Sequence, residues 1–116
     1  MDYHCYLIVY KENDCIKRTY IGITNNLNKR IKQHNGLISG GAKSTRCSNE
    51  WYYHTIVSNF KNKGEALSFE YNWKKYSRAG IDNKIKQLNK ILPEAKFLHL
   101  KAQQHEENFD SHQANY

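Results

Sequence analysis

Three short segments of the chain are rich in β-branched and aromatic residues, a composition typical of β-strands. In residues 3–10 the side chains alternate between two faces, so that odd-numbered residues share one face and even-numbered residues, Tyr6 among them, share the other. Residues 18–23 form a second strand, and the polar link between the two predicts a turn and an antiparallel hairpin. This pairing brings Tyr6 and Tyr20 into one neighbourhood if both lie on the same face.

Three further segments carry the 3.6-residue apolar period of amphipathic helices. They cover residues 25–34, 64–78 and 81–92. The first begins with two asparagines suited to cap a helix and closes on Gly36, and the last is stopped by Pro93. The third strand, over residues 50–60, lies between the first two helices.

Regular patterning ends after residue 93. We therefore expect one body over residues 1–93 and a C-terminal extension over residues 94–116 that is polar and flexible. Phe97, Leu98 and Leu100 are the apolar residues of this extension that could pack back onto the body. With 116 residues, the chain is long enough for one hydrophobic core but not for two.

The first helix carries two charged or titratable residues at the edge of its apolar face. Leu27 and Ile31 define that face, and Arg30 and His34, four residues apart, lie beside it and lean towards the sheet. An arginine without a special role normally faces water. The inward placement of Arg30 therefore indicates a functional position.

A carboxylate occupies a similar position on the second helix. Glu70 falls within the arc defined by Ala66, Phe69 and Trp73. Inside an apolar arc it needs a cation, a metal ion or hydrogen bonds. The alternative is a surface ion pair with Lys74 at the i+4 position.

Charge and composition narrow the classes of partner. Eighteen Lys and Arg residues against eleven Asp and Glu give a net charge of +7, and the excess lies in the body. A basic body suits a polyanion such as nucleic acid, although a soluble basic protein without such a partner has the same balance.

The three cysteines form neither a disulfide framework nor a CxxC zinc site. The sequence shows no signal peptide and no long apolar run, so we expect an intracellular protein, cytoplasmic or nuclear and without membrane association.

The loop after the first helix combines glycines, hydroxyls and cations. It contains the run Ser39-Gly40-Gly41-Ala42-Lys43-Ser44-Thr45-Arg46. Backbone N–H groups of such a run could cradle a phosphate, but the spacing is not that of a Walker A loop. A plain flexible loop is the alternative.

Taken in order, these features resemble the GIY-YIG nuclease superfamily over roughly residues 3–92. The residues that carry the resemblance are Tyr6 in His4-Cys5-Tyr6, then Tyr20-Ile21-Gly22, Arg30, His34 and Glu70. The first motif departs from the family pattern, since it lacks the glycine and the isoleucine. Within the superfamily the chain is most similar to the nuclease domain of Slx-type structure-selective endonucleases. That likeness rests on His34-Asn35-Gly36, Gly40-Gly41-Ala42 with Thr45, the Trp51 strand, and Phe69-Glu70-Tyr71 with Trp73.

The resemblance implies an α/β (α+β) fold, a small three-stranded and mostly antiparallel sheet flanked by helices, with the active site on the sheet surface. It implies that Tyr6 acts as a phenolate that activates water, and that Tyr20 orients water or phosphate. By the same likeness Arg30 grips the scissile phosphate, His34 relays a proton, and Glu70 binds one Mg²⁺ or Mn²⁺ ion.

Each of these roles has a structural alternative. The two tyrosines could serve only strand packing, and Arg30 could form a salt bridge to Glu70 without any chemistry. His34 could be a cation at a helix C-terminus that complements the helix dipole.

Two functions of different classes follow. The first is a metal-dependent DNA endonuclease that hydrolyses phosphodiester bonds, on branched or flapped DNA. The second is a non-catalytic nucleic-acid-binding module of the same fold. Five cations are candidates for holding the DNA backbone, or are solvated: Lys43, Arg46, Lys74, Lys75 and Arg78. The C-terminal Cys/His zinc module by which Slx-type proteins dock a partner is not found in this sequence, so we expect a free-standing nuclease of viral or microbial type.

Overall fold

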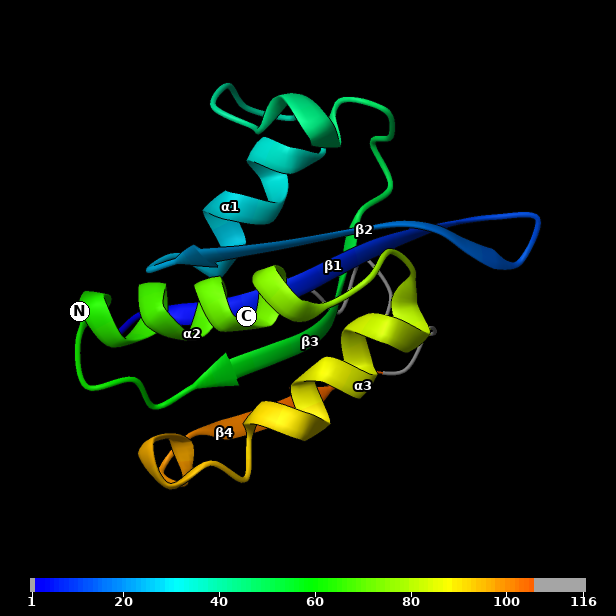
Figure 1. The fold of residues 1–116 in the computed structure, drawn as a ribbon. Coiled ribbons are helices and arrows are strands. Elements are labelled where there is room, and N and C mark those ends of the chain that lie inside the picture. The colour runs from blue at the N-terminus through cyan, green and yellow to red at the C-terminus, as the bar shows by residue number, and fades with distance from the viewer. Residues whose placement is uncertain (1, 106–116) are drawn as a thin grey trace.

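The computed structural model describes residues 2–105 and contains four strands and three α-helices in that range (Figure 1). In chain order they are β1 (His4–Glu12), β2 (Cys15–Thr24), α1 (Leu27–His34), β3 (Tyr52–Ser58), α2 (Lys63–Tyr76), α3 (Ile81–Ile91) and β4 (Lys101–Gln104). Short 3-10 helices lie at Lys43–Thr45 and Ala95–Phe97. Within this range no helix is both long enough and apolar enough to cross a bilayer.

The predicted hairpin is confirmed. β1 and β2 pair antiparallel, and the two residues between them, Asn13 and Asp14, both have positive φ, at 55° and 63°. Two successive left-handed residues match the right-handed twist of the flanking strands. The register places Tyr6 opposite Gly22 and Ile8 opposite Tyr20, so this pairing fixes both tyrosines.

The sheet has one more strand than expected. Its order is β2-β1-β3-β4, antiparallel throughout, so the α+β prediction holds but the count of three strands is wrong. β4 consists of four exposed residues that pair with β3 through the backbone, as Val57 does with Ala102. Its sequence lacks the apolar alternation by which a strand is recognised. The part of the expected flexible extension that follows His105 lies outside the described residues.

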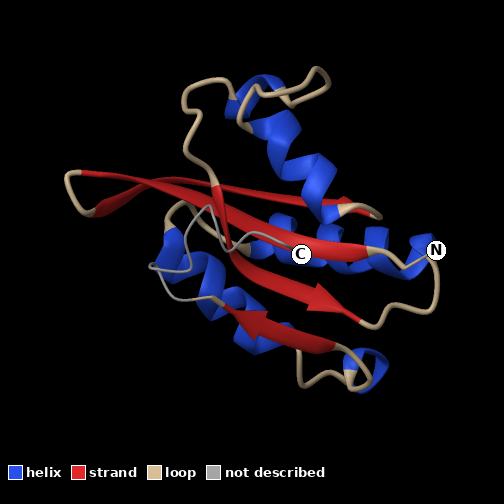
Figure 2. Cartoon of the chain, turned by 180° about the vertical axis from the view of Figure 1, so that it is seen from behind, coloured by secondary structure: helices blue, strands red, loops and turns tan. Residues whose placement is uncertain are grey.

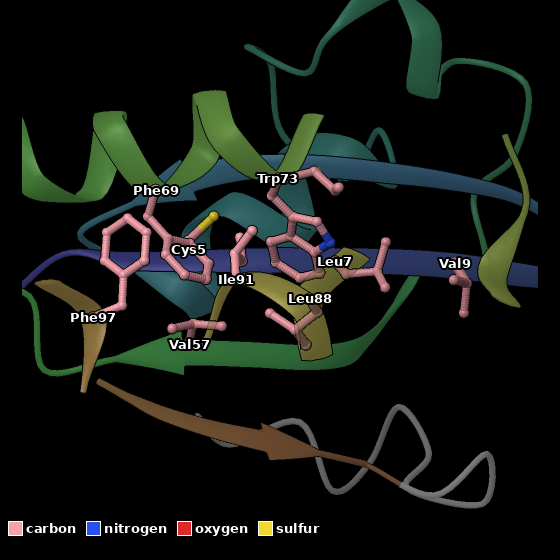
Figure 3. Close-up of a cluster of buried hydrophobic side chains, with 10 residues drawn as sticks. Cys5, Leu7, Val9, Val57, Phe69, Trp73, Leu88, Ile91 and Phe97 are labelled. Atoms are coloured by element: carbon pink, nitrogen blue, oxygen red, sulfur yellow. The ribbon is translucent and has the colours of Figure 1, made fainter. Parts of the chain in front are cut away.

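Both faces of β1 are buried, which explains why this strand organises the molecule. On one face α2 and α3 cover the sheet, and their side chains meet those of the strands in a core (Figures 2 and 3). That core contains Cys5, Leu7, Val9, Ile21, Val57, Phe69, Trp73, Leu88, Ile91 and Phe97. The other face packs under α1 with Tyr6, Ile8, Tyr10, Ile31, Trp51, Tyr53 and Ile56. Tyr6 therefore points away from the larger core and into the α1 layer.

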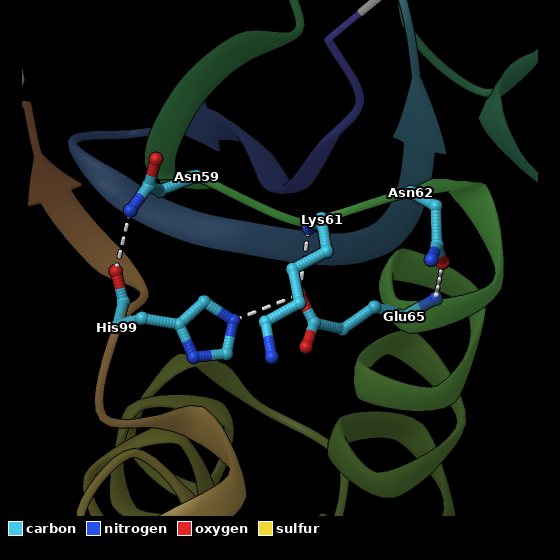
Figure 4. A network of polar contacts seen from close by, with 5 residues as sticks. All are labelled: Asn59, Lys61, Asn62, Glu65 and His99. Carbon is cyan, nitrogen blue, oxygen red and sulfur yellow. Dashed lines mark hydrogen bonds and ion pairs between the residues drawn. The ribbon is translucent and has the colours of Figure 1, made fainter.

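A polar network fixes the start of α2 against the chain that follows α3 (Figure 4). The side chain of Asn62 accepts from the backbone N–H of Glu65 at 2.9 Å, which caps the helix. One carboxylate oxygen of Glu65 lies 2.8 Å from Nε2 of His99 and accepts from the N–H of Lys61 at 2.8 Å. Asn59 donates to the carbonyl of His99 at 2.7 Å. These bonds hold the helix that carries Glu70.

Candidate active site

A chain of hydrogen bonds runs inward from the hydroxyl of Tyr6. That hydroxyl lies 2.7 Å from Nε2 of His34, and Nδ1 of the same ring lies 3.0 Å from Oγ1 of Thr45. Thr45 donates its own proton to the carbonyl of Ala42 at 2.9 Å, so it accepts from Nδ1–H. This leaves Nε2 of His34 unprotonated and makes Tyr6 the donor.

Arg30 reaches the same hydroxyl from one helical turn earlier. Its Nε donates to the Tyr6 oxygen at 3.2 Å, and one terminal nitrogen donates to Oε1 of Gln33 and to the carbonyl of Gly40, both at 2.9 Å. The guanidinium is thus held on both sides, by its own helix and by the following loop. Gln33 is a positioning residue that the sequence analysis did not indicate.

Gly22 makes room for the tyrosine ring. A Cβ at this position would lie 2.5 Å from the Tyr6 hydroxyl oxygen and 2.8 Å from the ring carbon that bears it. Because Tyr6 and Gly22 are partners in the β1–β2 register, any side chain at position 22 would push the hydroxyl away from His34. Position 22 therefore requires glycine because the Tyr6 ring occupies the space of a Cβ, and not because the backbone there has an unusual conformation.

The ends of α1 and the loop after it are pinned close to the site. Asn26 caps the N-terminus, and Gly36, with a φ of 75°, follows the C-terminus. Asn35 exchanges two hydrogen bonds with the backbone of Trp51, at 3.0 and 2.7 Å. Gly41 lies so close to the backbone of Gln33 that a Cβ would collide with its carbonyl. The loop thereby supplies the carbonyls that hold Arg30 and Thr45.

Tyr20 connects this cluster to α2. Its ring centroid lies 6.4 Å from that of Tyr6 and 5.0 Å from that of His34, and the ammonium of Lys74 lies 5.6 Å from its ring. Lys74 in turn pairs with Glu70 at 3.2 Å. The structure thus brings Tyr6, Tyr20, Arg30 and His34 into direct contact.

Glu70 joins the cluster through Lys74. The i,i+4 pair that the sequence left open is present, and Glu70 is only 19% exposed while Lys74 is 47% exposed. Over residues 2–105 no ion pair joins Glu70 to Arg30. Glu70 therefore lies at the α2 side of the site, with a cation already beside it.

Burial sets the protonation of the Tyr6–His34 pair. It raises the pKa of Tyr6 well above its ordinary value of 10, despite the opposing effect of Arg30. Burial and the neighbouring Arg30 lower the pKa of His34 to about 4. At neutral pH the pair consists of a phenol and a neutral imidazole. In the resting protein Tyr6 is thus a proton donor. The phenolate that the family resemblance implies for the reaction stays a prediction.

The donor set at the α2 side suits a hard cation held by few protein ligands. In the described part of the chain no group of three or more His, Cys, Asp or Glu side chains could hold a metal ion. A single carboxylate, that of Glu70, is what an ion such as Mg²⁺ can accept when it keeps most of its waters. The position beside this carboxylate already holds one cation, the ammonium of Lys74.

The candidate DNA-binding cations fall on two sides of this cluster. Lys43 begins the 3-10 helix of the loop and Arg46 follows it, beside a hollow of about 520 Å³ that His34 and Thr45 help to line. Lys74, Lys75 and Arg78 lie on or just after α2, and all five are exposed.

Sequence similarity to a known family and to known proteins covers most of the chain. Residues 2–86 match the model of the GIY-YIG catalytic domain. The chain is 42% identical over 81 residues to a structure-specific endonuclease subunit SLX1 homolog of Giardia intestinalis, covering 70% of this chain and 23% of that protein. It is 41% identical over 71 residues to structure-specific endonuclease subunit slx1 of Schizosaccharomyces pombe, covering 61% and 26%. It is also 39% identical over 89 residues to the uncharacterized protein L300 of Acanthamoeba polyphaga mimivirus, covering 75% and 51%. The matched part is about a quarter of the length of the first two relatives.

Proposed function

We propose, since this chain belongs to the GIY-YIG family, that it is a metal-dependent endonuclease that hydrolyses phosphodiester bonds in branched or flapped DNA. The observation that carries the proposal is the hydrogen-bonded path from Arg30 through Tyr6 and His34 to Thr45. In this path Nε2 of His34 can accept the proton of Tyr6, and the guanidinium of Arg30 lies beside the Tyr6 oxygen that loses it.

The path accounts for water activation. As a water molecule attacks phosphorus, its proton passes to the Tyr6 oxygen while Tyr6 gives its own proton to Nε2 of His34. The imidazolium that forms keeps its Nδ1–H bond to Thr45, and Arg30 stabilises negative charge that develops on the phenol oxygen. The bond from phosphorus to the leaving oxygen breaks, and that oxygen takes its proton from solvent.

Arg30 has a second task at the phosphate. The nitrogens already described hold it to Tyr6, Gln33 and Gly40. A guanidinium held in this way is the group that would bind the scissile phosphate and stabilise the charge that develops on it.

Glu70 is the residue that would hold a divalent ion, Mg²⁺ or Mn²⁺. Such an ion, when bound, neutralises charge on the leaving oxygen. Lys74 pairs with one oxygen of this carboxylate, and DNA phosphate is the partner that it would take if the ion displaced it. Lys74 thus neutralises Glu70 in the free protein and would become available to the DNA once the metal ion is bound.

The substrate class rests on charge and on the relatives. The net charge of +7 supports a polyanion, and two of the relatives are structure-specific endonuclease subunits by name. We expect this chain to act on DNA branch points, and in the compartment that holds that DNA.

A non-catalytic binding module is the competing function, and Tyr6→Phe separates the two. Cleavage is measured under single-turnover conditions on flaps, forks, four-way junctions and plain duplex, with Mg²⁺ or Mn²⁺. The wild type should cut branched DNA, and Tyr6→Phe should cut about 10²- to 10⁴-fold more slowly while it binds as before. A wild type that binds these DNAs but cuts none of them would support the binding module. Near-normal rates in Tyr6→Phe would show that Tyr6 does not activate water.

A further inference from the structure

A second, smaller pocket lies on the other side of Tyr20 from the candidate active site. It is a hollow of about 300 Å³ on β2, lined by Thr19, Tyr20, Ile21, Lys74, Ala79 and Lys84. Two of the side chains that line it are lysines, and none is acidic. Tyr20 belongs to both places, because its ring contacts Tyr6 and His34 and also Lys74.

Lys84 is held in place at both ends of the residue. Its ammonium donates to Oγ of Ser77 at 3.1 Å, and Ser77 donates to the carbonyl of Trp73 at 2.6 Å. The indole N–H of the fully buried Trp73 donates to the carbonyl of Lys84 at 2.9 Å. A lysine with no role beyond solubility is normally a mobile, solvated side chain. This one is half-buried and anchored to the core.

The charge of Lys84 is not balanced within the described part of the chain. Lys74 has Glu70 as its partner, whereas the ion pairs between residues 2 and 105 include none for Lys84. Burial and the neighbouring charge of Lys74 lower the pKa of Lys84. Glu70 balances only one of these two charges, so an anion that enters the pocket beside the half-buried ammonium of Lys84 would be favourable.

We propose that this pocket binds a backbone phosphate of the DNA strand close to the scissile phosphate, with Lys84 as its fixed cation and Lys74 as its second. The proposal rests on the proposed function, because it assumes that a DNA strand bound at Arg30 continues past Tyr20 to Lys84. A phosphodiester suits the pocket since it is a small anion that can accept hydrogen bonds from both ammonium groups.

The test compares Lys84→Gln with Lys86→Gln, a matched control in which an exposed lysine of the same helix is changed. Binding to branched DNA is measured with the metal chelated, so that no cleavage occurs. Each DNA carries one neutral methylphosphonate linkage, moved one position at a time through the strand near the branch. In the wild type one linkage outside the scissile position should weaken binding about tenfold.

Lys84→Gln should bind unmodified DNA about tenfold more weakly and should show no further loss at that linkage. Lys86→Gln should keep the full loss. The proposal is overturned if Lys84→Gln responds to every linkage as the wild type does. It is also overturned if only a 5′-terminal phosphate, compared with a 5′-hydroxyl, matters to Lys84, because the ligand would then be a strand end.

Two further readouts keep the outcome clear. Lys84→Arg retains the charge and should therefore keep most of the affinity that Lys84→Gln loses. A loss of binding caused only by poor folding of Lys84→Gln would be the same at every methylphosphonate position. If the protein binds with this pattern but cuts no DNA, the pocket stands and the nuclease proposal fails. If it cuts DNA normally and Lys84→Gln shows no coupling, only the pocket is wrong.

Discussion

At the scale of single residues, the same burial that makes Tyr6 a poor acid makes His34 a reluctant base. The pKa of Tyr6 is raised and that of His34 is lowered to about 4, so the proton stays on the phenol in the free protein. We expect this proton to move to His34 only when phosphate and the attacking water are bound. Such a pair avoids an unpaired buried phenolate before the substrate arrives.

The lowered pKa of His34 predicts a pH-dependent stability. Between pH 6.5 and about 4 the unfolded chain binds a proton on this residue and the folded chain does not. The contribution of His34 to stability should therefore be complete above pH 6.5 and be lost as the pH falls towards 4, with a total of about 3 kcal/mol. Denaturant unfolding at a series of pH values measures it.

His34→Gln is the control for this pH effect. Burial also lowers the pKa of His4, His54 and His105, so only the difference between wild type and variant reports on His34. That difference should change across the window and be flat above it. A difference that does not vary with pH would show that folding does not lower the pKa of His34.

Glu70 and Lys74 give opposite predictions although they form one pair. Glu70→Gln should lower single-turnover cleavage by several orders of magnitude and keep or improve DNA affinity, because a negative charge that faces phosphate is removed. Lys74→Ala should weaken DNA binding and change the free energy of unfolding by only about 0.2–1 kcal/mol, the usual range for exposed pairs. If Glu70→Gln cleaves DNA at a normal rate in Mg²⁺, this carboxylate does not hold the metal ion.

At the scale of elements, the β1–β2 hairpin and α1 act as one unit that seats Tyr6. The sheet register sets Tyr6 against Gly22, and α1 brings His34 and Arg30 to the hydroxyl. Neither element alone fixes the oxygen. A small displacement of either one should therefore be seen first in catalysis.

Gly22→Ala tests this unit. The added Cβ would overlap the Tyr6 hydroxyl, so we expect a loss of about 1–3 kcal/mol in unfolding free energy and a severe loss of cleavage. Rates are compared for Gly22→Ala, Tyr6→Phe and the double variant. If the glycine acts through the hydroxyl, the double variant should cut no more slowly than Tyr6→Phe. Fully additive effects would point to a second defect elsewhere.

The elements also show why part of the site was predictable and part was not. Helical periodicity placed Arg30 and His34 on the sheet side of α1, because their spacing is a local property of the sequence. The bonds of Arg30 to Gly40 and of His34 to Thr45 depend on the path of a loop that has no period. β4 escaped prediction for a related reason, since its four residues are exposed and pair through the backbone alone. The sequence analysis does not single out Lys84 for the same kind of reason, because its anchor, Trp73, lies on another helix.

At the scale of the whole molecule, the sheet separates the larger hydrophobic core from the Tyr6–His34 path. The core under α2 and α3 holds the fold, while the α1 layer holds the Tyr6–His34 path (Figures 1 and 3). The two sides meet at β2, where Tyr20 contacts Lys74. A DNA strand that follows this edge would touch cations from both sides.

The charge of the molecule then predicts the salt dependence of binding. If about five phosphates of duplex DNA are neutralised, the slope of log K against log salt should be roughly −4 to −5. Replacing a phosphate-binding lysine should reduce the slope by about one, while replacing a lysine that faces only solvent should leave it unchanged. Fluorescence anisotropy from low to moderate salt, with the metal chelated, measures the slopes for the wild type, Lys74→Ala, Lys84→Gln and Lys86→Gln. We expect shallower slopes for Lys74→Ala and Lys84→Gln and no change for Lys86→Gln. A wild-type slope near zero would mean that the basic body of the protein is not its DNA surface, whatever the active site does.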